Sequence, residues 1–557
     1  MTDLKIPVGI SDFAKIRNYD YYYVDKTGLI EDLLENETAE VTLITRPRRF
    51  GKTMGMSMLA NFFDIRKDSK AMFAGLQISK NATLCKEWMN QWPVVFLSFK
   101  NIDGDKFSLA YQQMVYEIGL LYDSYSELLS SNKLSEDDKA LFLQLKRRTA
   151  NEIDVLRSIQ FLLSLLYKHY GKTVILLLDE YDVPLAKSSA HGYYPDMLNI
   201  IKSMMTTSLK DNNTLRFAVI TGCLRIAKES IFTGTNNFVS DTISSSHLNE
   251  YFGFTQADVD QILKDADCME HADDIKNWYD GYHFGNLDVY CPWDVMNYLR
   301  DLQRNPKAKP ASYWKNTSDN SIIRSFIDYA GHSISRKLEI LLSGGHILQR
   351  IEENLTYDYL HSSEENLWSI LYLTGYLTQA REEDLPEPLP EGSSALMIPN
   401  AEVREIFETT IQKWFDESAQ TWNRKALFDA VWSGDTETLT KEMNKLLRKT
   451  ISYHDYREDF YHAFLAGIFA GAGYEVDSNK EHGEGRSDVV VLDPEGDRVA
   501  IFEAKYSRTQ DAMPRDCAAA LQQIEDRQYA NEFEEDYDSV LCYGIAFYKK
   551  RCLVQTK

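Results

Sequence analysis

A basic loop near the N-terminus carries residue types that bind phosphate. Residues 46–53 read Arg-Pro-Arg-Arg-Phe-Gly-Lys-Thr and lie between a short apolar segment and a helical pattern. A phosphate-binding loop, or P-loop, is a strand-to-helix turn whose N–H groups surround the phosphates, with a lysine for the β/γ charge and a hydroxyl for magnesium. Gly51, Lys52 and Thr53 match the end of that motif, whereas Arg46 stands where its first glycine belongs.

The remaining residues of this loop are candidates for the same site. Arg48 and Arg49 either add phosphate contacts or face ordinary acidic neighbours, and Phe50 directly precedes the glycine. We therefore predict that residues 48–53 bind ATP and that Thr53 is also a ligand of Mg²⁺.

A second apolar segment, Val174 to Leu178, runs directly into Asp179 and Glu180. In P-loop ATPases a carboxylate at this place orients magnesium, and a neighbouring one polarises the attacking water. This predicts Asp179 as a nucleotide and metal residue and Glu180 as a catalytic one. The alternative is a buried strand that ends in a polar turn. The two motifs in this order favour nucleotide binding.

A third apolar segment, Phe217 to Thr221, places Thr221 where a polar sensor of the γ-phosphate would lie. Arg225 follows shortly and either contacts phosphate or lies on a surface helix. The tyrosines at positions 21–23 either line an adenine pocket or pack in the core, and we expect core packing.

Two carboxylates and a lysine near the C-terminus are spaced for metal chemistry. A strand from Ser487 to Leu492 carries Asp488, a turn follows at residues 493–497, and Val499 to Lys505 forms the returning strand. Side chains alternate along a strand, so Glu503 and Lys505 share a face, and the hairpin can bring Asp488 beside Glu503.

Oxygen ligands on neighbouring strands suit Mg²⁺ or Mn²⁺, which can polarise a phosphodiester and lower the pKa of a bound water. We predict Asp488 and Glu503 as catalytic metal ligands and Lys505 as the residue that orients the water or stabilises developing charge. The alternative is an ordinary solvent-facing hairpin. Glu458 is a further candidate ligand or a helix N-terminal acid, and His462 either approaches the site or packs on a helix face.

The elements that must position these residues alternate between strands and helices. Strands are expected at residues 41–45, 94–99, 174–178 and 217–221, and an amphipathic helix from Ile153 to near Gly171. Apolar strands separated by helices predict a parallel sheet covered on both faces. The fold class is therefore α/β with several domains.

We expect domains at residues 1–245, 246–450 and 451–557. The middle one is mostly helical. Its helix over residues 365–373, strands over 377–380 and 395–398, and helix from Asn400 form either a winged helix or a helical lid. The last domain returns to strands and helices with a core of its own.

Composition limits the class of protein. No stretch approaches the roughly 18 apolar residues of a membrane span, and the N-terminus lacks a secretory signal pattern, so a cytoplasmic location is expected. The seven cysteines form no CxxC pair and suggest neither a disulfide framework nor a zinc site. The net charge of −23 means that any contact with nucleic acid must be local, metal-bridged or shared across an assembly.

Nearly the whole chain resembles the AAA-ATPase-like family of bacterial proteins joined to its usual partner, a PD-(D/E)xK nuclease-superfamily domain. TRPRRFGKT, LLLDEYDVPL and WYDGYHFGNLDVYCPWDVMNYL carry the first resemblance, and YREDFYHAFLAGIFAGAGYEV, GRSDVVVLD and IFEAKY the second. The resemblance implies ATPase roles for Lys52, Thr53, Asp179 and Glu180, and nuclease roles for Asp488, Glu503 and Lys505. That family often has arginine at the position of Arg46, and Ser487 stands where the nuclease superfamily usually has proline.

These features predict a probable ATPase that regulates an attached Mg²⁺-dependent DNA nuclease and that can form homo-oligomers. The alternative is a nucleotide-dependent switch or scaffold whose nuclease fold is an inactive binding module. The acidic net charge motivates that alternative, because weak affinity for DNA fits a processive enzyme poorly.

Overall fold

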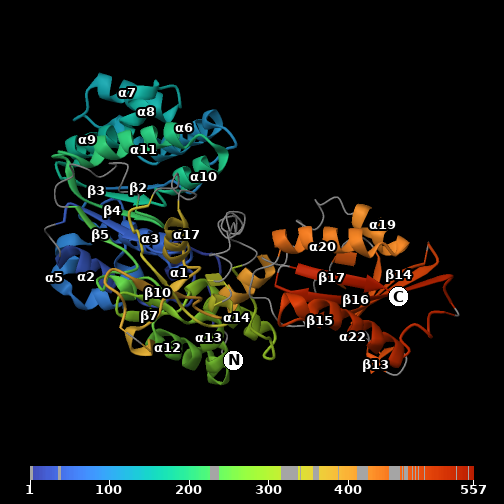
Figure 1. Ribbon diagram of the computed structural model, residues 1–557. Coiled ribbons are helices and arrows are strands. Elements are labelled where there is room, and N and C mark those ends of the chain that lie inside the picture. Colours follow the sequence, from blue (N-terminus) through green and yellow to red (C-terminus); the bar gives the residue numbers. More distant parts are fainter. Residues whose placement is uncertain are drawn as a thin grey trace. The chain divides into compact units, whose positions relative to one another are not determined.

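In the computed structural model the chain divides into two compact units (Figure 1). The first comprises Met1–Asp319 and His346–Ile406, and the second Asn320–Gly345 and Phe407–Lys557. The structure describes residues 4–35, 39–225, 238–314, 337–338, 340–355, 363–386, 388–410, 425–450, 465–466, 468–469, 474–478, 481–482, 485–486, 488–494, 496–534, 536–549 and 551–556.

A five-stranded parallel sheet organises the first unit. Its order is β2-β3-β4-β1-β5, with β1 at Val41–Thr45, β2 at Val94–Ser98, β3 at Val174–Asp179, β4 at Leu215–Gly222 and β5 at Phe238–Asp241. The predicted parallel sheet is confirmed. The short edge strand β5 is the member that was not expected.

Helices cover both faces of this sheet, because its central strands are apolar on both faces. Ile175 and Leu177 of β3 pack in one core with Met56 and Phe63 of α3 (Lys52–Phe63). The group from α6 to α11 gathers beyond the other face (Figure 1). These helices are α6 (Phe107–Asp123), α7 (Glu136–Lys146), α8 (Glu152–Leu156), α9 (Ser158–Tyr170), α10 (Val183–His191) and α11 (Tyr194–Leu209).

The amphipathic helix expected from Ile153 is two helices. The chain breaks at Arg157 between α8 and α9, and Ile153 is 66% exposed rather than part of the core. The expected end is correct, since Gly171 terminates α9 in the left-handed conformation that glycine favours.

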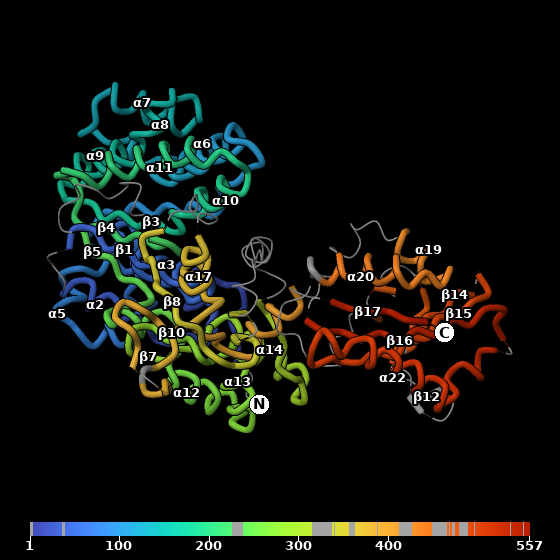
Figure 2. The backbone as a smooth tube through the Cα atoms, in the orientation of Figure 1, coloured from blue at the N-terminus to red at the C-terminus, as the bar shows by residue number. Residues whose placement is uncertain are grey.

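The rest of the first unit is mostly helical, as expected for the middle of the chain (Figure 2). α12 (Gln256–Ala266), α13 (Ala272–Tyr279) and α14 (Pro292–Arg304) share a core. α17 (Glu364–Leu373) is followed by β9 (Thr378–Gln379), β10 (Ser394–Met397) and helical residues 401–410. β8 (Ile347–Gln349) adds a third antiparallel strand to the expected pair.

The second unit is built on a mixed sheet of order β11-β14-β15-β16-β17. β15 and β16 are parallel, and the other neighbours are antiparallel. The bounds are β11 (Glu475–Ser478), β14 (Val489–Asp493), β15 (Arg498–Tyr506), β16 (Ser539–Tyr548) and β17 (Arg551–Thr556).

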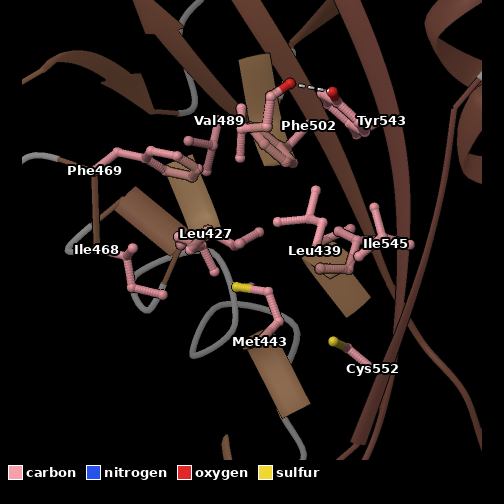
Figure 3. Close-up of a cluster of buried hydrophobic side chains, with 14 of the residues drawn as sticks. Leu427, Leu439, Met443, Ile468, Phe469, Val489, Phe502, Tyr543, Ile545 and Cys552 are labelled. Carbon is pink, nitrogen blue, oxygen red and sulfur yellow. Dashed lines mark hydrogen bonds between the residues drawn. The ribbon is translucent and has the colours of Figure 1, made fainter. Parts of the chain in front are cut away.

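Alternation along these strands divides the core of this unit in two. Phe502 and Ala504 of β15 face α19 (Lys425–Ser433) and α20 (Thr436–Thr450), in the apolar cluster of Figure 3. Val499 and Ile501 face the other way, toward α22 (Met513–Asp526). By the same alternation Glu503 and Lys505 lie on the α22 face.

No helix among the described residues combines the length and the apolar character that crossing a bilayer requires.

Candidate functional site

Polar residues end the strands of the parallel sheet and meet at its carboxyl edge. Asp179, the last residue of β3, is completely buried. The Thr53 hydroxyl donates to its Oδ2 over 2.9 Å, and the Thr221 hydroxyl donates to its Oδ1 over 2.7 Å. Ser98 at the end of β2 adds a contact of 3.3 Å. The structure thus brings Thr53 and Asp179 into contact, as a shared magnesium site requires.

Thr221 holds the carboxylate of Asp179 through this hydrogen bond. It is fully buried and does not line the adjacent cavity. Ser98 was missed in the sequence because one serine at the end of an apolar strand gives no signal of its own.

Lys52 opens α3 and folds back onto the loop. Its Nζ donates to the carbonyls of Arg46 and Pro47, each over 2.8 Å, and lies 3.7 Å from Cys223 Sγ. Gly51 has φ of 87°, a left-handed conformation that glycine adopts without strain. The loop therefore presents its lysine at the start of the helix, as phosphate binding demands.

The contacts of Arg46 explain how the loop accommodates arginine at the position of the motif's first glycine. Its side chain is completely buried and forms an ion pair with Asp241 at the end of β5. The guanidinium also lies over the rings of Phe252 and Phe284, at 5.3 and 5.6 Å from their centroids. Burial lowers the pKa of Arg46, and the charge of Asp241 opposes that shift. Arg46 is thus an anchor for the loop.

The rest of the loop also has structural contacts. Phe50 is buried against Tyr282 and Phe284, with ring centroids 4.9 and 5.0 Å away. Arg49 has φ of 72° and lies 4.7 Å from the centroid of Trp293. Arg48 is half-buried, and its charge opposes the rise in the pKa of Glu180 that burial causes.

A cavity of about 360 Å³ opens beside the loop. Its lining includes Gly51, Lys52, Thr53 and Glu180, which are the groups that phosphates need. It also includes aromatic and aliphatic side chains, among them the following residues: Ile10, Tyr22, Tyr23, Leu29, Met58, Phe254, Trp293 and Met296. An apolar pocket beside a phosphate loop suits the base of a nucleotide. Tyr22 and Tyr23 pack against apolar cores of the first unit, as expected, and they also line this cavity.

Glu180 lines this cavity. Its φ of 53° is in the left-handed region, which residues other than glycine adopt uncommonly. Burial raises its pKa, and the charges of Lys52 and Arg48 oppose that rise. A half-buried carboxylate with a raised pKa is a suitable base for polarising water.

Arg225 lies three residues beyond the end of β4 and is half-buried. The chain from residue 226 to 237 lies outside the described residues.

The second unit brings its three predicted residues to one face of the sheet. Val489 pairs with Phe502 in antiparallel register, so Asp488 lies opposite Glu503. Asp488 Oδ2 accepts the backbone N–H of Ala504 over 2.7 Å. Lys505 Nζ donates to Glu503 Oε1 over 3.0 Å. The alternative of a solvent-facing hairpin does not hold, since Glu503 is 1% exposed and Asp488 9%.

The donor set fits a divalent cation. Glu503 Oε2 is buried and has no hydrogen-bond partner among the described residues. Burial, followed by the charge of Asp488, raises the pKa of Glu503 to about 7. A buried carboxylate oxygen without a donor, beside a second carboxylate, is a place where Mg²⁺ would replace the missing partner.

The two other candidate residues of this site, Glu458 and His462, lie outside the described residues. Within the described ranges, no group of three or more His, Cys, Asp or Glu side chains could hold a metal ion. The candidate cation site therefore rests on Asp488 and Glu503.

Comparisons with known proteins find one domain family in each half of the chain. Residues 7–232 match the family described as predicted AAA-ATPase, and residues 456–557 match the PD-(D/E)XK nuclease superfamily. An uncharacterized protein in the vnfD 5′ region of Azotobacter chroococcum mcd 1 is 25% identical over 565 residues, covering 98% of this chain and 97% of that protein. No solved structure matches the chain.

Proposed function

For a chain that carries an AAA-ATPase-like domain at its N-terminal end and a PD-(D/E)XK nuclease superfamily domain at its C-terminal end, we propose the function of an ATP-regulated, Mg²⁺-dependent DNA nuclease. The observation that carries the nuclease assignment is the buried Oε2 of Glu503, which has no hydrogen-bond partner in the described part of the chain and lies beside Asp488 and Lys505. The contact of Thr53 with Asp179 beside the cavity carries the ATP site.

At the ATP site each residue has one task. Lys52 leaves the two loop carbonyls and binds the β- and γ-phosphates, while Thr53 and Asp179 hold magnesium. Glu180 lines the cavity and polarises the attacking water. The aromatic and aliphatic side chains of the cavity hold the base.

At the nuclease site Asp488 and Glu503 hold the cation. A bound Mg²⁺ supplies polarisation of the phosphodiester and a water of lowered pKa. Lys505, fixed by Glu503 at 3.0 Å, orients the attacking water or stabilises charge on the phosphate. The N–H of Ala504 fixes the carboxylate of Asp488, so the ligand is already oriented.

The regulatory link begins at the phosphate loop and runs within the first unit. Arg49 Nη1 donates to the carbonyl of Tyr313 over 3.3 Å, and the N–H of Trp314 donates to Glu402 Oε1 over 2.8 Å. The chain passes into the second unit after Asp319 and again after Ile406. A movement of the loop on ATP binding therefore reaches both segments that lead into the nuclease unit.

Gly375 lies close both to Pro47 of the loop and to Trp314. A Cβ atom added at Gly375 would lie 2.8 Å from the Pro47 Cβ and 3.2 Å from the ring of Trp314. Glycine at this position leaves room for Pro47 on one hand and for Trp314 on the other. We call Tyr313 and Trp314 the connector.

The test is cleavage of labelled plasmid and single-stranded DNA by the full-length protein, with Mg²⁺ or Mn²⁺ and with or without ATP. Asp488→Asn and Lys505→Ala should abolish cleavage and keep ATP binding, whereas Lys52→Ala should lose ATP binding. Asp497→Asn is the matched control, because Asp497 is exposed in the turn at the opposite end of the same hairpin.

Two outcomes would count against the proposal. If purified Lys505→Ala cuts as well as the parent, the nuclease assignment is wrong. If the parent binds DNA and ATP but cuts under no metal or nucleotide condition, the chain is a nucleotide switch whose nuclease fold is a binding module.

A further inference from the structure

A groove of about 580 Å³ lies in the second unit, along the edge strand β17. α20 forms one wall, and the start of α22 with Gln510 forms the other. Its charged lining residues are Lys441, Lys445 and Arg551, and we call it the basic groove. No carboxylate lines it among the described residues, in a chain whose net charge is −23.

Hydrogen bonds hold the walls of the basic groove in place. Asn444 of α20 pairs with the backbone of Cys552 in both directions, its Nδ2 donating and its Oδ1 accepting, each over 2.9 Å. The Thr440 hydroxyl accepts from the N–H of Val554 over 3.0 Å. Because α20 is bonded to the strand edge, Lys441 and Lys445, one turn apart on this helix, are fixed relative to β17.

The side chains of the groove extend from these fixed walls. Lys441, Lys445 and Arg551 are exposed. Arg551 Nη1 donates to Gln510 Oε1 over 3.0 Å, and Lys445 pairs with Glu442 on its own helix. Gln510 is neutral, and Glu442 balances the charge of Lys445 alone. The groove therefore stays cationic overall.

The strand register places the basic groove level with the nuclease residues. Lys505 of β15 pairs with Ala546 of β16, which pairs with Leu553 of β17. Leu553 lines the groove. Since neighbouring strands lie about 4.8 Å apart, the groove begins roughly 10 Å from the strand of Lys505. Paired residues point to the same face, so Leu553 and Lys505 share the face that α22 covers.

We propose that the basic groove binds the sugar-phosphate backbone of the nucleic acid that is cut at Asp488, Glu503 and Lys505. This inference rests on the proposed nuclease function and adds where its substrate lies. An acidic protein can bind a polyanion only through local cations, and lysine and arginine contacts to phosphate fix register without selecting sequence. The groove supplies such cations about two strands away from the catalytic lysine.

The experiment measures affinity of the full-length protein for duplex and single-stranded oligonucleotides over a range of salt. Calcium replaces magnesium to separate binding from cleavage. The variants are Lys441→Gln, Arg551→Gln and their combination. The matched control is Arg527→Gln, an exposed arginine at the far end of α22, roughly 20 Å along the helix from Met513 at the groove.

The slope of log affinity against log salt is negative. Each groove variant should make it shallower, by about 0.9 for duplex or about 0.7 for a single strand. The double variant should show about twice that change, with cleavage in Mg²⁺ reduced in parallel. ATP binding and the unfolding temperature should stay at parental values. Arg527→Gln should keep the parental slope.

The outcomes separate this inference from the function on which it rests. If the parent binds and cuts DNA and the double variant does so with the same salt slope, the groove is not a nucleic-acid site and the nuclease assignment stands. If the parent neither binds nor cuts nucleic acid, the proposed function fails and the groove assignment fails with it.

Discussion

Arg46 shows how a phosphate-binding loop can be anchored without its first glycine. The carbonyl of this residue accepts the Lys52 ammonium, while its side chain points into the core and pairs with Asp241. The backbone thus faces the nucleotide site and the side chain joins two neighbouring strands. Arginine at this position is a structural tie between β1 and β5.

Restoring the motif's glycine is therefore expected to harm the protein. Arg46→Gly leaves the buried Asp241 without its partner, which typically costs about 3–5 kcal/mol of unfolding free energy. Denaturant unfolding of the first unit measures the loss. Arg46→Met combined with Asp241→Asn should recover most of it, because no buried charge remains. A glycine variant as stable as the parent would show that the ion pair has no structural role.

A buried pair of carboxyl groups near the loop makes stability depend on pH. Asp294 and Glu402 are both fully buried. Glu402 Oε1 accepts the N–H of Trp314, whereas Glu402 Oε2 and both carboxylate oxygens of Asp294 have no hydrogen-bond partner among the described residues. Burial, followed by the charge of Asp294, raises the pKa of Glu402 to about 10. One proton shared by the two groups supplies the missing hydrogen bond at neutral pH.

The sign of this effect follows from the raised pKa. The folded state keeps a proton that the unfolded chain releases above its ordinary pKa near 4.5, so the stabilisation is complete below that pH and is lost as pH rises toward 10. The unfolding free energy should fall by up to about 1.4 kcal/mol per pH unit in this window. In Glu402→Gln the unfolding temperature should vary less between pH 6 and 9 than in the parent, whereas Glu408→Gln, exposed on the same helix, should match the parent. Equal pH profiles for all three proteins would exclude the shared proton.

At the scale of elements, α20 covers the open edge of the C-terminal sheet. Edge strands attract other strands unless their backbone groups are satisfied. Asn444 and Thr440 bond the backbone of β17 at Cys552 and Val554. A helix therefore takes the place that a sixth strand would occupy.

Removing this cover should weaken the second unit. Asn444→Ala leaves one N–H and one carbonyl of β17 unbonded, at a cost of about 1–3 kcal/mol, and it exposes an edge for intermolecular pairing. Thermal unfolding and light scattering measure the two effects. Glu437→Ala, on an exposed position of the same helix, is the control. An alanine variant that matches this control would show that water replaces the asparagine without loss.

Particular elements show what could be predicted from sequence. The strands β1 to β4 are runs of apolar residues and were expected, while β5 (FVSD) is a short, partly polar edge strand without that signal. The hairpin of β14 and β15 was predicted from its turn residues and from the alternation of side chains along a strand. The predicted neighbourhood of Asp488 and Glu503 is confirmed by the register of the two strands. A pocket lined by residues 21–23 was one of two alternatives, but the rest of the cavity could not be predicted. Phe254 and Trp293 are ordinary core residues in sequence and become part of a pocket only when distant segments meet.

At the scale of the whole molecule, the distribution of charge matters more than its sum. The chain is strongly acidic, yet Lys441, Lys445 and Arg551 gather in one groove level with Lys505. The arginines of the phosphate loop are likewise concentrated within residues 46–49. Acidic surface elsewhere would repel nucleic acid from the wrong places and direct it to the groove.

The proposed regulation of cleavage by ATP requires that a change in the first unit alters the activity of the second. Arg49 contacts the connector through the carbonyl of Tyr313, and its guanidinium also lies over the ring of Trp293 in α14. Arg49→Ala removes both contacts but leaves Gly51, Lys52 and Thr53 in place. The variant should therefore bind ATP within several-fold of the parent, while the ratio of DNA cleavage with ATP to cleavage without it falls toward one.

Arg66 provides the matched control for this change. Its guanidinium also stacks on a tyrosine, 4.0 Å from the centroid of Tyr125, and donates to a backbone carbonyl, that of Ser124, away from the connector. Arg66→Ala loses this stacking and carbonyl contact and, in addition, the ion pair of Arg66 with the buried Asp64. Although its structural loss is larger than that of Arg49→Ala, it should keep the parental ratio. If Arg49→Ala also keeps that ratio, the signal does not pass through Tyr313, and the packing of Pro47 and Trp314 around Gly375 becomes the route to examine.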